Sequence, residues 1–217
     1  MGTKRKFPER KHRIVKTAEK IFAEKGFYSA TISEIAKAAE VSDPTIYEYF
    51  SNKEQLLFAV PEEATAQGIK ALKSILQYHR GAANKLRAFI YYQFLFYQNN
   101  PDWASVVLLI LKQYRGYLKT PTYKTIRKWS RIIIEIVREG IDSGEFKADV
   151  NPYIVRTVVL GAIEHAVISH LLLGRYGDLR ELVDPITDMI IFGIRKEPGQ
   201  ENVVNVRFVM VKGSDQE

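Results

Sequence analysis

The chain contains no cysteine, and this absence excludes disulfide bonds, thiolate metal sites and cysteine nucleophiles. The N-terminal charged residues are not followed by an apolar segment, so we expect no signal peptide. The longest apolar runs, such as 104–111, fall far short of the ~20 residues that a membrane helix needs. We therefore expect a soluble, cytoplasmic protein that has no membrane partner.

Residues 58–196 also lack the patterns that carry catalysis. We find no glycine-rich phosphate loop, no nucleophile elbow and no paired-histidine metal motif. His165 and His170 are five residues apart, which places them on different faces of a helix. We therefore expect a protein that is not an enzyme and that holds no metal and no cofactor.

Positive charge is concentrated near the N-terminus. The whole chain carries a formal net charge of +7, with a pI of about 9.4. Residues 4–20 alone contain eight basic and two acidic residues, a net charge of +6. Such a segment favours nucleic acid as a partner, although an ordinary solvated helix face would show the same pattern.

Apolar residues recur at helical spacing along almost the whole chain, which predicts an all-α fold. The first helix contains 14–22 and ends at Gly26. We expect a kink or split at Pro61, because proline removes a hydrogen bond from a helix interior. The later helices are expected at 31–39, 44–50, 53–78, 82–98, 101–114, 122–143, 152–173 and 179–195.

A helix-turn-helix is predicted at 31–50. Thr31 and Glu34 have capping-box spacing, and 41–44 form a break between two short helices. On the second helix Ile46 and Phe50 share the inner face. Four residues then face outward, where they could approach base edges and phosphates: Pro44, Thr45, Tyr47 and Glu48. Lys53, at the start of the next helix, is placed to meet a phosphate.

The segments 22–28, 31–39, 41–50 and 52–56 together resemble the signature of the TetR family of transcriptional repressors. The resemblance covers about residues 10–57. It implies an N-terminal three-helix DNA-binding domain and a larger C-terminal helical domain for ligand binding and dimerisation. We expect domains at 1–54 and 55–197, followed by a C-terminal extension at 198–217, where alternation over 204–210 is strand-like.

By position, the resemblance assigns DNA contacts to Thr31, Thr45, Tyr47, Tyr49 and Lys53. Many relatives carry glycine in place of Pro44. Glu48 could accept a hydrogen bond from cytosine or point away from the DNA, and the tyrosines could instead pack on the next helix. The predicted DNA-binding set is Thr31, Ser42, Pro44, Thr45, Tyr47, Glu48, Tyr49 and Lys53.

Aromatic residues are so abundant over 89–129 that a single core face cannot bury all of them. The remainder could line an apolar pocket that also carries a few polar anchors. The family resemblance also implies such a pocket. The predicted ligand-binding residues are Tyr92, Phe96, Trp103, Leu108, Leu111, Tyr114, Arg115, Trp129, Ile133 and Glu164.

Helices 152–173 and 179–195 are apolar on more than one face. One face can pack in the core of the chain, and the other must be buried against a partner. In the TetR family the two helices pair with their mates in a homodimer. The predicted interface residues are Ile163, Ala166, Val167, His170, Ile186, Met189 and Ile190.

A narrower resemblance covers about residues 115–195, where 139–146, 161–164 and 176–179 are similar to TetR-family repressors of fatty-acid degradation. Those repressors respond to long-chain acyl-CoA esters. The resemblance implies a long apolar tunnel with a basic mouth. The mouth could be formed by Lys112, Arg115, Lys119, Lys124, Arg127, Lys128 and Arg131.

The sequence therefore predicts a ligand-responsive repressor that binds a palindromic double-stranded operator as a homodimer. Its small-molecule inducer would be a long apolar ligand such as an acyl-CoA. Two alternatives stay open: a repressor of this family that responds to aromatic or cationic drugs, and a helical lipid-binding carrier. Promoter DNA binding separates the carrier from the repressors, and a ligand panel separates the two repressors.

Overall fold

The computed structural model describes residues 3–196, except for the side chains of residues 3–7 and of Arg115. Within this part of the chain the regular elements are all helical, and the β pairing is limited to one isolated bridge between Phe146 and Arg195. The all-α prediction is therefore confirmed. The expected C-terminal extension lies outside the described residues.

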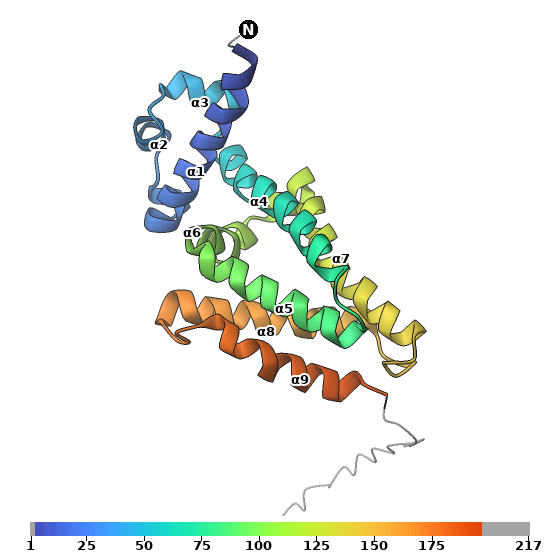
Figure 1. Cartoon of the computed structure of the whole chain (residues 1–217). Helices are drawn as coiled ribbons and strands as arrows, with labels where there is room; N and C mark the ends of the chain where they lie inside the picture. The colour runs from blue at the N-terminus through green and yellow to red at the C-terminus, as the bar shows by residue number, and fades with distance from the viewer. Residues whose placement is uncertain (1–2, 197–217) are drawn as a thin grey trace, which may run out of the picture.

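Three helices form the N-terminal cluster at the top of Figure 1: α1 (Thr3–Ser29), α2 (Ile32–Ala38) and α3 (Asp43–Tyr49). The backbone of Gly26 has a φ of 77°, so the first helix is interrupted where the sequence predicted its end, and a further turn follows. One buried set of apolar side chains holds the three helices together: Ile14, Ala18, Phe22, Ile35, Ala36, Ala39, Ile46 and Phe50.

Helix α4 (Lys53–Leu76) leads from this cluster into the rest of the molecule (Figure 1). It runs through Pro61 as one element, so of the expected kink or split, the split does not occur. The residues on both sides of Pro61, from Leu56 to Leu72, bury one face of α4. Burial of this face stabilises a helix that has lost a backbone hydrogen bond at the proline.

The remaining long helices form a layered bundle: α5 (Ala82–Asn99), α7 (Pro121–Asp142), α8 (Pro152–Leu173) and α9 (Val183–Ile194). Helix α5 contacts the other three and lies between α4 and the pair α8–α9 (Figure 1). The ninth helix was predicted from residue 179, but residues 179–182 form a 3₁₀ turn before α9 begins.

The predicted helix 101–114 is wrong. Helix α6 (Pro101–Ser105) is followed by a π-helical turn (Val106–Ile110) and two 3₁₀ turns (Leu111–Gln113 and Arg115–Lys119). The apolar pattern was read at 3.6 residues per turn, but the wider π turn buries three successive side chains, Val106 to Leu108.

Helix α8 is long and apolar enough to cross a membrane by length and composition. One helix of this kind is weak evidence, because core helices of soluble proteins pass the same test. Here α8 packs against α5, α7 and α9. Only 33% of this apolar stretch is buried within the protomer, and a second apolar face of α8 is exposed there.

The turn between α7 and α8 closes the N-terminus of α5. Helix α5 has no capping side chain of its own. The carboxylate of Glu145 instead accepts hydrogen bonds from the amides of Ala82 and Ala83, at 2.6 and 3.0 Å. Gly144, with a φ of 73°, turns the chain so that Glu145 can reach them.

Candidate functional site

The helix-turn-helix is held by local hydrogen bonds. The Thr31 amide donates to the Glu34 carboxylate at 3.0 Å, and the Glu34 amide donates to the Thr31 hydroxyl at 3.2 Å. Lys25 also donates to Glu34, and this bond, with those from Thr31, lowers the pKa of that carboxyl. Thr31 is exposed, but its hydroxyl already serves as the cap of α2.

Helix α3 presents an exposed outer face. Ser42 caps it by accepting from the Thr45 amide, and its hydroxyl lies 2.9 Å from the Thr45 hydroxyl. Pro44 and Glu48 are exposed, and Tyr47 is 54% exposed. Six of the eight residues predicted to contact DNA therefore lie at the surface of α2 and α3. Five of them are exposed and Thr45 is half-buried; the six are Thr31, Ser42, Pro44, Thr45, Tyr47 and Glu48.

Tyr49 and Lys53 lie in different surroundings. The Tyr49 ring is partly buried beside Phe50. The Lys53 ammonium donates to the carbonyl oxygens of Phe27 and Ala30, each at 2.8 Å, and lies 4.5 Å from the centre of the Phe27 ring. Lys53 thus closes the C-terminal end of α1, and a phosphate would have to compete with these carbonyls.

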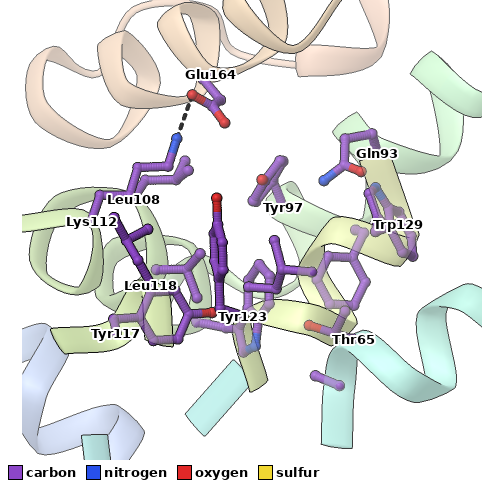
Figure 2. Close-up of a pocket in the computed structure, with 15 residues that line it drawn as sticks. Thr65, Gln93, Tyr97, Leu108, Lys112, Tyr117, Leu118, Tyr123, Trp129 and Glu164 are labelled. Atoms are coloured by element: carbon purple, nitrogen blue, oxygen red, sulfur yellow. Dashed lines mark ion pairs between the residues drawn. The ribbon is translucent and has the colours of Figure 1, made fainter. Parts of the chain in front are cut away.

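A cavity of about 330 Å³ lies among α4, α5, α7, α8 and the segment 103–118 (Figure 2). Aromatic and aliphatic side chains dominate its wall. The residues that line it are Ala64, Thr65, Gln93, Phe96, Tyr97, Trp103, Val107, Leu108, Lys112, Tyr117, Leu118, Tyr123, Ile126, Trp129 and Glu164.

The wall also carries polar groups that have no partner within the described residues. They include the indole nitrogens of Trp103 and Trp129 and the hydroxyls of Thr65 and Tyr117. Burial raises the pKa of Tyr117, and burial together with the charge of Glu164 raises that of Tyr97, so both phenols stay neutral. Buried groups without partners are costly, and a ligand or water that meets them would recover that cost.

An ion pair stands at one end of the cavity, between the Lys112 ammonium and the Glu164 carboxylate, 2.5 Å apart (Figure 2). Beyond it, between α7 and α8, lies a groove of about 1010 Å³, which we call the basic groove. Lys112, Tyr123, Ile126 and Glu164 line both spaces.

The basic groove carries more positive than negative charge. Its lining includes four arginines in addition to Lys112: Arg127, Arg131, Arg138 and Arg156. Glu135 and Glu164 are its two acidic residues. An apolar cavity therefore adjoins a cationic surface at a polar junction, an arrangement that suits a ligand with a long apolar part and an anionic head.

The predicted ligand-binding residues divide into three groups. Phe96, Trp103, Leu108, Trp129 and Glu164 line the cavity. Tyr92 lies behind it, where its ring stacks on Phe96 at 6.4 Å. The others are elsewhere: Leu111 and Ile133 lie in the core, Tyr114 packs on Phe27 and Phe58, and the Arg115 side chain is outside the described residues.

Several lining residues were not predicted, among them Thr65, Gln93 and Tyr97. Gln93 lies three residues before Phe96 on α5, and Tyr97 lies four residues after Gln93, so helical spacing from Phe96 could have found Gln93 and, through it, Tyr97. Of the predicted basic mouth, Lys112, Arg127 and Arg131 line the groove, whereas Lys119, Lys124 and Lys128 are exposed outside it.

Four of the predicted interface residues are buried within the protomer: Ile163, Ala166, Val167 and Ile190. Buried side chains offer a partner almost no surface, so these assignments require correction. His170 and Ile186 are half-buried, and Met189 is 77% exposed. The exposed apolar face of α8 and α9 consists of Ile154, Val158, Leu172, Leu173, Met189 and Phe192.

Two protein-family models match the chain. The model described as bacterial regulatory proteins of the tetR family matches residues 14–60, which contain the helix-turn-helix. The model described as the C-terminal region of YsiA-like protein matches residues 62–193, which contain the cavity and the basic groove.

Individual relatives match over most of their length. The fatty acid metabolism regulator protein of Bacillus subtilis is 29% identical over 184 residues, which cover 85% of this chain and 95% of that protein. A crystal structure of the transcriptional regulator FadR from Bacillus subtilis in complex with stearoyl-CoA aligns with a TM-score of 0.79 at 29% identity, covering 85% of this chain and 99% of the other. The fatty acid degradation regulator FadR from Bacillus halodurans aligns with a TM-score of 0.77 at 25% identity, covering 84% and 94%.

Proposed function

The chain belongs to the TetR family of bacterial regulatory proteins, and we propose that it is a transcriptional repressor whose hold on operator DNA is released by a long-chain acyl-CoA. The observation that carries the ligand class is the junction between the apolar cavity and the basic groove. The acyl chain would lie in the cavity, and the phosphates of coenzyme A would lie among the groove arginines. The relative that binds stearoyl-CoA supports this ligand class.

The ion pair at the junction has a specific part in this proposal. A ligand that occupies both spaces passes between Lys112 and Glu164. An acyl-CoA can offer Lys112 a carbonyl or phosphate oxygen in exchange for the carboxylate. Ligand binding therefore replaces one polar contact of Lys112 with another, while the Glu164 carboxylate, whose side chain is 31% exposed, would be hydrated instead.

A second ligand class has an observation in its favour. The cavity wall is rich in aromatic rings and carries the carboxylate of Glu164, and such a wall also suits aromatic or cationic drugs. A thermal-shift panel separates the classes. Stabilisation by hydrophobic cations, together with none by acyl-CoAs, would favour this second candidate.

The DNA-binding part of the proposal uses the domain at residues 1–54. The exposed face of α3 would enter the major groove, and the basic N-terminal segment would approach phosphates. The domain at residues 55–197 would bind the ligand and hold two protomers together. We propose a cytoplasmic protein that binds and regulates but does not catalyse.

Tyr47→Ala is expected to weaken operator binding by about 1–3 kcal/mol, because the exposed ring is placed to contact a base edge. Fluorescence anisotropy with labelled operator would measure the loss. Tyr78→Ala is the matched control, since Tyr78 is also exposed but lies beyond the far end of α4. An equal affinity for both variants would remove Tyr47 from the DNA-contacting set.

Ligand and operator are expected to weaken each other by the same factor, since linkage between two binding sites is reciprocal. A coupling of about 1–3 kcal/mol would be typical, which corresponds to about 5–150-fold in affinity. Titrating stearoyl-CoA with and without saturating operator measures one direction, and titrating operator with and without stearoyl-CoA measures the other.

The outcomes separate the candidate functions. Equal stearoyl-CoA affinities with and without operator would contradict release by this ligand. Failure to bind promoter DNA at all would favour the lipid carrier that the helical fold also permits.

A further inference from the structure

A third hollow, which we call the α1 groove, lies between α1, α4 and α5 and has a volume of about 420 Å³. Its rim is exposed and polar and includes His12, Lys16, Glu63 and Gln67. Its floor is buried or half-buried and mostly apolar: Val15, Val60, Ala64, Gly68, Tyr92 and Phe96. The groove therefore has the lining that an apolar chain needs.

The α1 groove and the ligand cavity share a wall. Ala64 and Phe96 are the two residues that line both spaces. Phe96 is half-buried, with Tyr92 on the groove side at 6.4 Å and Trp103 on the cavity side at 4.9 Å between ring centres. Ala64 contributes only a methyl group. The shared part of the wall is thus the Phe96 ring and the Ala64 methyl group, and the Trp129 ring of the cavity packs beside it against Gly68 and Tyr92 of the groove floor.

The volume of the cavity sets a limit on the ligand. At about 330 Å³ it lies at the lower end of the ~300–1,000 Å³ range of ligand pockets. We propose that the α1 groove receives the distal end of long acyl chains, which pass the partition formed by Ala64 and Phe96. This inference rests on the proposed function and specifies its ligand further. Shorter chains would end within the cavity.

The position of the α1 groove would make operator release depend on the length of the acyl chain. At its rim the His12 ring nitrogen on α1 lies 2.6 Å from the Glu63 carboxylate on α4. A chain end in the groove therefore lies between the first helix of the DNA-binding domain and the helix that joins this domain to the sensor. A long chain can separate α1 from α4, whereas a short chain binds without touching α1.

The test is a series of ligands from octanoyl-CoA through lauroyl-CoA and palmitoyl-CoA to stearoyl-CoA. The two tryptophans of the chain, Trp103 and Trp129, both line the cavity, so intrinsic fluorescence reports ligand binding. In the unmodified protein, affinity should rise by about fourfold for each added methylene through the series, because each buried methylene contributes a similar free energy. Operator release should be strong only for the longer members.

Two variants block the proposed path. Ala64→Leu thickens the partition, and Ala71→Leu fills the outer part of the groove at an exposed position. Both should reduce the ratio of stearoyl-CoA to octanoyl-CoA affinity by at least about tenfold, which corresponds to fewer than two buried methylenes. Ala66→Leu is the matched control, since this exposed α4 residue lines neither space. It should keep the ratio of the unmodified protein.

The outcomes test the proposed function and the groove assignment separately. If acyl-CoAs release the operator but all four proteins show the same affinity ratio, the proposed function stands and the groove assignment is overturned. If no acyl-CoA changes the fluorescence or the operator affinity, the acyl-CoA proposal fails and the groove assignment fails with it.

Discussion

Phe192→Asp is expected to produce monomers that no longer hold the operator. Phe192 is 84% exposed on α9, three residues after the exposed Met189, and α9 packs against α8. We propose that the exposed apolar face of α8 and α9 is the dimer interface, where the partner would cover this ring and an unpaired carboxylate in its place would be buried at high cost. Separate protomers lose the gain from joining two DNA-binding modules, so operator affinity should fall by about 100–10,000-fold.

Sedimentation equilibrium and operator binding are measured on the same protein. Ile75→Asp is the control, since it places the same charge on an exposed apolar residue of α4, outside the proposed interface. A Phe192→Asp protein that remains a dimer with unchanged operator affinity would place the interface elsewhere. Charges at Ala166 or Ile190 would not make this test, because both residues are buried in the protomer.

Gly140→Ala is expected to destabilise the protein, although alanine is the better helix former. Helix propensity alone predicts a gain of about 1 kcal/mol for this change within a helix. However, a Cβ atom at Gly140 would overlap the Phe146 ring and would lie 2.8 Å from the Ala82 Cβ. Overpacking of a buried site costs about 1–3 kcal/mol, and we expect the upper end because both neighbours are buried and Ala82 is short.

The overpacking cost minus the gain in helix propensity leaves a net loss of about 2 kcal/mol in the free energy of unfolding. For a chain of this size, the melting temperature measured by calorimetry should therefore fall by roughly 4–8 °C. Gly116→Ala is the control, since nothing lies within 4 Å of its Cβ position. Phe146→Leu in the Gly140→Ala background should recover part of the loss. A Gly140→Ala protein as stable as the unmodified one would show that the α7–α8 turn yields without cost.

The helix-turn-helix could be predicted from the sequence because its determinants are local. The capping box at Thr31, the break at Ser42 and the inner face of Ile46 and Phe50 all lie within twenty residues. The position of Lys53 could not be predicted in the same way. Its partners are backbone carbonyls more than twenty residues earlier, and carbonyls leave no signal in a sequence.

The sequence predicted which region of the chain forms the cavity, but only part of the set of residues that line it. The π turn over 106–110 changes which side chains face inward, and a 3.6-residue period cannot show such a change. Leu108 and Leu111 were both assigned to the ligand, but Leu108 lines the cavity and Leu111 lies in the core.

Four of the seven predicted interface residues are buried in the protomer for a different reason. Helix α8 is apolar on two faces, so periodicity identifies both faces without ranking them. Ile163, Ala166 and Val167 belong to the face that packs on the protomer. Val158 and Leu172 belong to the opposite face. Only the positions of α5 and α9 decide which of the two remains exposed.

The capping of α5 by Glu145 has a consequence for the order in which the chain folds. The first turn of α5 depends on a carboxylate 63 residues further along the chain, so the helix cannot close its own N-terminus. We therefore expect that turn to become fully ordered only after α7 has formed and the chain has turned at Gly144. The central helix of the bundle thus contains a contact of high sequence separation, and we expect this cap to form later in folding than the local caps of α2 and α3, since long loops are costlier to close.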